Sequence, residues 1–187
     1  MRIISGKARG TRLYTLEGYN TRPTLDRVKE SLFNIIQKEI PNSVFLDLFS
    51  GSGAIGLEAV SRGAKKAILC DQSKEAIQII KKNIEKTHLE DQVEYCQLPF
   101  EKMLKTKIKE KIDIVYIDPP YKTNLAYEAV KIILEEDLIS ESSYIIIETD
   151  EEKRVIEQIK KLEIDIVDQR KYGRAYLIFL KKKSKMN

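Results

Sequence analysis

The residues with the clearest chemical pattern are Asp118, Pro119, Pro120 and Tyr121, which directly follow the apolar run IDIVYI. The Asp118 carboxylate and the Pro119 main-chain carbonyl are acceptors that could hold the N–H groups of an amine. Two consecutive prolines donate no N–H and restrict the backbone, so these acceptors are held in position. Tyr121 adds a flat ring on which an extruded base could stack. We therefore predict that these four residues are catalytic in a reaction at an exocyclic base amine.

A second pattern, DLFSGSGAIG, begins at Asp47, where an apolar run turns through glycines into a helical segment. Gly51 and Gly53 permit unusual backbone angles and the close approach of a ligand. Asp71 stands twenty positions after Gly51, where its carboxylate could accept both hydroxyls of a ribose. The predicted cofactor contacts in this region are Asp47, Phe49, Gly51, Gly53, Asp71 and Gln72.

The charge of Asp47 favours one kind of cofactor. GSGAIG also satisfies the weak GxGxxG dinucleotide pattern. A carboxylate at this place would repel a pyrophosphate and attract the ammonium of a methionine moiety. We therefore predict S-adenosylmethionine as the cofactor. Its sulfonium is already a good electrophile, so catalysis needs mainly alignment; whether Asp118 acts as a base or only as an acceptor stays open.

The elements that must position these residues alternate along the chain. Strands are predicted at 44–49, 67–70, 93–96, 112–117 and 144–148, and most of them are apolar throughout, as in a parallel sheet covered on both faces. Helices are predicted at 54–62, 74–86 (with Ser73 as N-cap), 126–136 and 151–161. The end of the chain is predicted to form an antiparallel hairpin with its turn around 171–173. These elements predict an α/β class I methyltransferase fold, which is Rossmann-like and has a seven-stranded, mostly parallel sheet ending in an antiparallel hairpin.

An extension precedes this sheet. A small β-hairpin around Gly6 to Gly10 is predicted, and a helix from Pro23 to about Ile40, which Pro41 stops. We assign residues 1–40 to this basic extension and residues 41–187 to the methyltransferase domain, as one structural unit.

The composition narrows the class of protein. The 187 residues suit a single domain with 42% hydrophobic and 33% charged residues. No signal peptide or bilayer-spanning run is apparent. Cys70 and Cys96 fit no disulfide framework, and one histidine, His88, leaves almost nothing for a metal site. We expect a reduced, cytoplasmic protein without metal or membrane contact, and we predict that His88 is exposed.

Positive charge is concentrated at the start of the chain. The first 29 residues hold seven basic residues and two acidic ones, a balance of 7 − 2 = +5, against +4 for the whole chain. A basic hairpin before the site is suited to clamping phosphates, and Tyr14 and Tyr19 could stack on unpaired bases. The predicted RNA-binding residues are Arg2, Lys7, Arg9, Arg12 and Arg27. No apolar stripe demands a dimer, so we expect a monomer.

With these motifs in place, the sequence resembles the bacterial RsmD family of 16S rRNA guanine-N2 methyltransferases over nearly its whole length. The resemblance rests on GKARGTRL, TRPTLDRVKESLFNII, DLFSGSGAIGLEAVSRGA and DPPY, of which the RPT-x-DRV-K-E block is the most specific. It implies S-adenosylmethionine as donor and one guanine of 16S rRNA, or of the assembling small subunit, as target. It also implies that Arg22, Pro23 and Thr24 approach the cofactor.

Three alternatives remain at this stage. An adenine-N6 DNA methyltransferase shares the amine chemistry, but usually carries a larger target-recognition region. An NAD-dependent oxidoreductase would use GSGAIG and Asp71, against the charge of Asp47. A non-catalytic RNA-binding assembly factor would not need the intact DPPY motif.

Overall fold

The alternating strands form one seven-stranded sheet in the computed structural model, which describes residues 1–16, 23–120 and 122–184, with the backbone alone at 23–25. The strand order is β3-β2-β1-β4-β5-β7-β6. Strands β1 to β5 pair in parallel, whereas β7 pairs antiparallel with both β5 and β6. The strands are β1 Val44–Asp47, β2 Lys66–Cys70, β3 Val93–Cys96, β4 Ile112–Ile117, β5 Ile139–Thr149, β6 Ile164–Tyr172 and β7 Ala175–Lys182.

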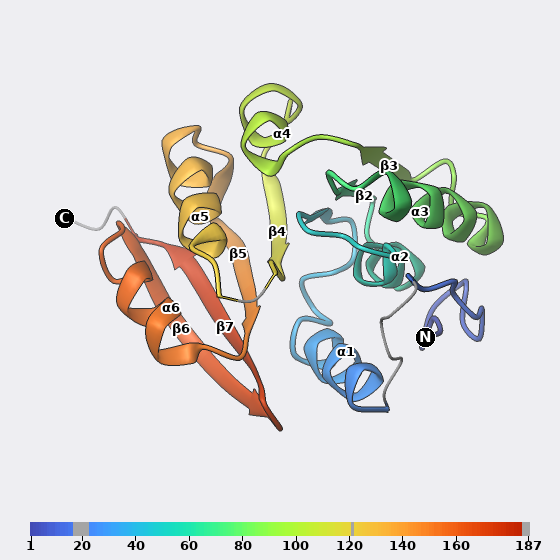
Figure 1. Cartoon of the computed structure of the whole chain (residues 1–187), viewed down its shortest axis with the longest axis horizontal. Helices are drawn as coiled ribbons and strands as arrows, with labels where there is room; N and C mark the ends of the chain where they lie inside the picture. Colours follow the sequence, from blue (N-terminus) through green and yellow to red (C-terminus); the bar gives the residue numbers. More distant parts are fainter. Residues whose placement is uncertain (17–22, 121, 185–187) are drawn as a thin grey trace.

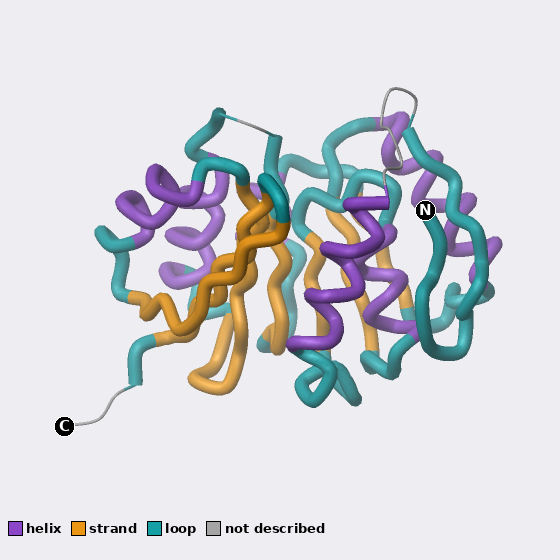
Figure 2. The backbone as a smooth tube through the Cα atoms, turned by 90° about the horizontal axis from the view of Figure 1, so that it is seen from below, coloured by secondary structure: helices purple, strands orange, loops and turns teal. Residues whose placement is uncertain are grey.

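Helices cover both faces of the sheet (Figures 1 and 2). One apolar core packs α1, α2 and α3 against the first face, and a second packs α4, α5 and α6 against the other. Burial of these apolar side chains stabilises the fold by about 1.5–3 kcal/mol for each large one. The helices are α1 Pro23–Ile35, α2 Ala54–Ser61, α3 Lys74–Thr87, α4 Phe100–Thr106, α5 Leu125–Glu135 and α6 Glu152–Ile159. The predicted fold class is therefore confirmed.

Several predicted boundaries are also confirmed, two differ by about five residues, and one helix was missed. Ser73 caps α3, because its Oγ accepts the amide N–H of Ala76 at 3.2 Å, and the C-terminal hairpin turns at Gly173. Helix α1 ends at Ile35 and not near Ile40, since the chain turns there to bury Ile40 in the core. Strand β5 starts five residues before the predicted 144, and α4 was not predicted.

The N-terminal extension packs its backbone on the end of α2. Its two segments run antiparallel, with one bridge between Arg2 and Arg12 in place of a longer ladder. The Lys7 amide donates to the Ser61 carbonyl at 2.9 Å. Gly6 has a φ of +90°, and a Cβ there would lie 1.8 Å from that same carbonyl oxygen. Only glycine fits so close an approach.

A buried carboxylate, Glu58 of α2, joins the extension to α1. Its two oxygens accept the amide N–H groups of Ile4 and Ser5 at 2.9 and 3.1 Å. They also form ion pairs with Lys29 of α1 at 3.1 Å and with Arg62 at 2.8 Å. The side chains of Lys29 and Glu58 are 1% and 0% exposed, so this contact is internal. Lys29, counted above in the basic surplus, is thus neutralised inside the protein.

Among the described residues, no helix is both long and apolar enough to cross a membrane. No group of three or more His, Cys, Asp or Glu side chains in the same residues is arranged to hold a metal ion. Cys70 is buried, Cys96 is partly buried, and both are free thiols on adjacent strands. His88 is exposed and ends α3 with a φ of +57°.

Candidate active site

The carboxyl ends of β1, β2 and β4 bring three predicted carboxylates to one edge of the sheet. Asp47, the last residue of β1, pairs in register with Leu69 of β2 and Tyr116 of β4. Asp71 and Asp118 each follow two residues after those partners. Because side chains alternate along a strand, Asp47 and Asp118 lie on the same face of the sheet, the face covered by α1, α2 and α3.

Asp47 is buried and held by the turn that follows it. Its Oδ2 accepts the Ser50 hydroxyl at 3.0 Å and the Gly56 amide N–H at 3.1 Å. Burial, with the nearby charge of Asp71, raises the pKa of Asp47 to about 7, although those two hydrogen bonds lower it. A carboxylate whose ionised form is disfavoured in this way is stabilised by a nearby cation.

The pKa of Asp47 predicts a specific pH dependence. The unfolded chain ionises this group above about pH 4, whereas the folded protein keeps the proton up to about pH 7. Between these values the folded state binds more protons, so its stability falls as the pH rises. In urea denaturation, we expect the free energy of unfolding of Asp47→Asn to exceed that of the wild type by up to about 4 kcal/mol at pH 8. The two free energies should approach each other near pH 4. The same difference at both pH values would contradict the assignment.

The glycine turn connects β1 to α2 beside Asp71. Gly51 has a φ of +58°, and no atom lies within 4 Å of the position of an added Cβ, so a ligand could approach its backbone. Its amide donates to Asp71 Oδ2 at 2.9 Å, and Asp71 Oδ1 accepts the Ser73 amide at 2.9 Å. A carboxylate has about four acceptor positions, so Asp71 keeps capacity for further donors. Gly53 precedes α2 with a φ of +83°.

Gly56, in contrast, is required for packing. A Cβ at this position would lie 2.1 Å from Leu69 Cδ2 and 3.5 Å from Asp47 Cβ. The third glycine of the motif therefore lets α2 lie close to β1 and β2, and this closeness allows its amide to reach Asp47. Of the other predicted cofactor residues, Phe49 packs on Phe100 with ring centroids 5.3 Å apart, and Gln72 is exposed.

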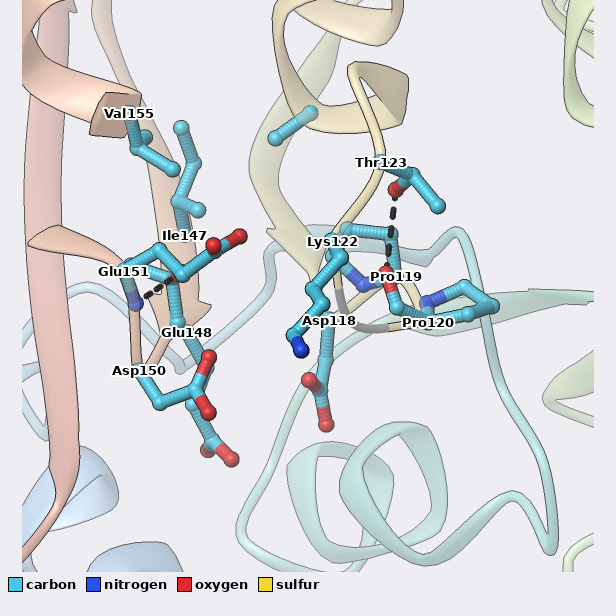
Figure 3. Close-up of a pocket in the computed structure, with 12 residues that line it drawn as sticks. Asp118, Pro119, Pro120, Lys122, Thr123, Ile147, Glu148, Asp150, Glu151 and Val155 are labelled. Carbon is cyan, nitrogen blue, oxygen red and sulfur yellow. Dashed lines mark hydrogen bonds between the residues drawn. The ribbon is translucent and has the colours of Figure 1, made fainter.

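A small cavity lies between the ends of β4 and β5 (Figure 3). Asp118, Pro119 and Pro120 line one side of it, and Glu148 and Asp150 line the other. Figure 3 shows the carboxylates of Asp118, Glu148 and Asp150 at the same end of this cavity. Asp47 does not line the cavity itself, but it lies close enough for its charge to act on Asp118. The two strand ends thus form a crevice rich in acceptors.

Glu148 was missed in the sequence. It follows the run YIII, so the rule that selects Asp118 after IDIVYI could have identified it. Its Oε1 accepts the buried Tyr116 hydroxyl at 2.5 Å, which fixes it beside β4. Burial raises the pKa of Glu148, although this hydrogen bond lowers it.

Repulsion among these groups acts on Asp118. The pKa of its carboxyl is raised well above the usual range, first because the surrounding protein displaces water and then because Glu148, Asp47 and Asp150 repel its charge. The Asp118 residue is nevertheless exposed at the surface, so solvent moderates both the burial and this repulsion. Such a crevice favours a cation or N–H donors over an anion.

The remaining predicted residues are less close to this crevice, or lie outside the described part of the chain. Arg22 and Tyr121 lie outside the described residues, and so does the side chain of Thr24. Lys7 and Arg9 lie at the C-terminal end of α2, opposite the end where Gly51 and Gly53 turn. The Lys7 ammonium donates to Gln92. The predicted RNA-binding residues Arg2, Lys7, Arg9, Arg12 and Arg27 are all exposed.

Comparisons with known proteins find relatives in sequence and solved structures with the same fold. The methyltransferase D of the ribosomal RNA small subunit from Haemophilus influenzae is 36% identical over 158 residues, which are 83% of this chain and 82% of that protein. The solved structure of yhhF from Escherichia coli superposes with a TM-score of 0.83 at 28% identity, covering 99% of each chain. The tRNA m1G37 methyltransferase of M. jannaschii shares the fold, with a TM-score of 0.65 at 22% identity over 88% of this chain and 50% of that one.

The fold, the solved structures that share it and the named relatives together identify a methyltransferase of the class I type. The family model described as Conserved hypothetical protein 95 matches residues 1–181. The chain therefore belongs to this family, which is the RsmD family that its motifs resemble.

Proposed function

We propose that the protein transfers a methyl group from S-adenosylmethionine to the exocyclic N2 amine of a guanine in 16S ribosomal RNA, in the cytoplasm. The main support for this reaction is the crevice, where Asp118 follows β4 on the same face of the sheet as Asp47. The name of the Haemophilus influenzae relative supports ribosomal RNA as the substrate. The RNA could be presented free or within the assembling small subunit.

The residues of the glycine turn fit the proposed cofactor. Asp47 is a buried carboxylate that a cation would stabilise, as the ammonium of a methionine moiety would do. Gly51 leaves open space beside its backbone, and Asp71 is oriented by two amides with acceptor capacity remaining. When bound, S-adenosylmethionine supplies a methyl group on a positively charged sulfur.

Asp118 and Pro119 act on the amine. An exocyclic amine is a weak nucleophile because its lone pair is delocalised into the ring. The Asp118 carboxylate and the Pro119 carbonyl accept its N–H groups and hold the nitrogen in line for attack. The amine loses a proton as the C–N bond forms. Asp118, whose pKa is raised by its neighbours, is the group that takes this proton.

A methyl-transfer assay tests this proposal. The substrate is 16S ribosomal RNA from a strain that lacks the enzyme, and the product is identified by nucleoside mass spectrometry. We expect N2-methylguanosine, and only when S-adenosylmethionine is present. N6-methyladenine formed in DNA, or stabilisation of the protein by NADH without stabilisation by S-adenosylhomocysteine, would reject the proposal.

The N-terminal extension is expected to contribute to RNA affinity. Replacing Arg9 and Arg12 with alanine removes two exposed charges, so RNA binding should weaken and its dependence on salt should flatten. Affinity for S-adenosylhomocysteine should not change, since neither side chain is among the predicted cofactor contacts. Fluorescence anisotropy with labelled RNA measures the first effect and calorimetry the second. Unchanged RNA affinity would rule out a phosphate clamp at these positions.

A further inference from the structure

The C-terminal hairpin brings a basic turn to the same edge of the sheet as the crevice. Strand β7 pairs antiparallel with β5, so that Tyr176 at its start lies opposite Thr149 at the end of β5. Thr149 lines the cavity beside Asp118. The turn between β6 and β7 therefore extends beyond the carboxyl edge, as Figure 1 shows at the bottom of the view.

A tight turn fixes the tip of this hairpin. Tyr172 pairs with Ala175, which leaves two residues in the turn. Gly173 has a φ of +64°, as the first residue of a type II′ hairpin turn requires. Tyr172 and Ala175 pack against the apolar core that α1, α2 and α3 form with the sheet. Arg174 is thus held at the exposed end of a rigid element.

The charge of this turn is opposite to that of the crevice. Arg170, Lys171 and Arg174 are all exposed, and the only acidic residue near them in sequence is Asp168, which pairs with Arg170 at 3.0 Å. The Lys171 ammonium lies 5.6 Å from the centre of the Tyr176 ring. A basic and aromatic rim therefore stands beside a cavity whose charged lining residues carry an excess of negative charge: Asp118, Glu148, Asp150 and Glu151, with Lys122.

An RNA substrate requires such a division of charge. The crevice repels phosphates, so a base can enter it only if its flanking backbone is held elsewhere. The predicted phosphate-binding residues Lys7 and Arg9 are at the far end of α2, whereas the hairpin turn adjoins the cavity. Arginine forms bidentate hydrogen bonds with phosphate. We infer that the β6–β7 turn binds the RNA backbone next to the target nucleotide, an inference that rests on the proposed RNA substrate.

The test compares three variants that change charge at different places. Arg170→Ala combined with Arg174→Ala removes two charges from the turn. The matched control, Lys105→Ala with Lys109→Ala, removes two exposed charges near the end of α4, which belongs to the helical layer of α4, α5 and α6. Asp168→Asn leaves Arg170 without its carboxylate partner while keeping an acceptor for the Gln169 amide. Thermal melting verifies that each variant is folded.

Binding to an in vitro transcript of 16S ribosomal RNA is measured by filter retention over a range of salt concentrations. We expect the arginine pair to weaken binding by about tenfold, and to reduce the slope of log K against log salt by about 1.4 if each arginine contacts one single-stranded phosphate. The lysine pair should have a clearly smaller effect, and Asp168→Asn should strengthen binding. Calorimetric affinity for S-adenosylhomocysteine should be unchanged throughout.

The results separate the two proposals. If the arginine pair binds the transcript as the wild type does, or no more weakly than the lysine pair does, the inference about the turn is overturned while methylation by the wild type persists. If the wild type neither binds nor methylates the transcript, and also fails on small ribosomal subunits from a strain that lacks the enzyme, the proposed function itself fails, and the turn loses its ligand with it.

Discussion

Replacing Asp118 with asparagine is expected to slow methyl transfer by about a hundredfold to a thousandfold, without loss of folding. Asparagine keeps an acceptor oxygen but cannot take the proton of the amine. It also removes one of the repelling carboxylates from the crevice. Because the pKa of Asp118 is raised in the folded protein, its ionisation destabilises the fold at neutral pH, so the variant should melt at a higher temperature.

Single-turnover transfer to 16S ribosomal RNA and a thermal melt measure these two effects. Asp165→Asn is the matched control, because Asp165 is exposed on β6 and pairs with Lys181 at the amino end of the hairpin; it should change neither quantity. A slower reaction together with a lower melting temperature would instead indicate that Asp118 has a structural role. Transfer at the wild-type rate would remove Asp118 from the mechanism.

Glu58→Gln is expected to cost about 3–5 kcal/mol of stability, the usual loss when one partner of a buried ion pair is removed. The amide cannot balance the charge of Lys29, whose side chain is 1% exposed and whose pKa is already lowered by burial. It also places an N–H group opposite one of the two backbone donors, Ile4 or Ser5, which then lacks an acceptor. Urea denaturation at neutral pH gives the free energy of unfolding.

Glu30→Gln is the control for this variant, since Glu30 is an exposed neighbour of Lys29 on α1, and a change below about 0.5 kcal/mol is expected. Adding Lys29→Met to Glu58→Gln removes the unpaired ammonium and should restore part of the lost stability. A Glu58→Gln protein as stable as the wild type would mean that the buried contact does not hold the extension to α1.

Much of the fold follows from local sequence patterns. Runs such as IDIVYI are apolar throughout, so they predict strands buried on both faces, and the Ser73 cap fixes where α3 begins. Helix α4 was missed because its seven residues contain only three buried apolar side chains, Phe100, Met103 and Leu104. So short a segment gives no clear helical period.

Only some residues of the site can be predicted from the sequence, for a different reason. Carboxylates that follow apolar runs, such as Asp118, can be found from the rule that parallel strands end at one edge. Contacts made across long sequence separations cannot. Glu58 has the sequence of an ordinary exposed helix position, yet it is buried with Lys29. The direction in which the extension packs decides where Lys7 and Arg9 lie, and no local pattern encodes it.

The pairing of Thr149 with Tyr176 has a consequence for which RNA could be accepted. The cavity and the basic turn adjoin the same end of one hydrogen-bonded ladder, so their separation cannot adjust to the substrate as it could across a hinge. A suitable RNA must offer a free base and a neighbouring phosphate at one fixed spacing. A fixed spacing between the cavity and the basic turn therefore selects an RNA loop by its shape, in addition to the identity of its base.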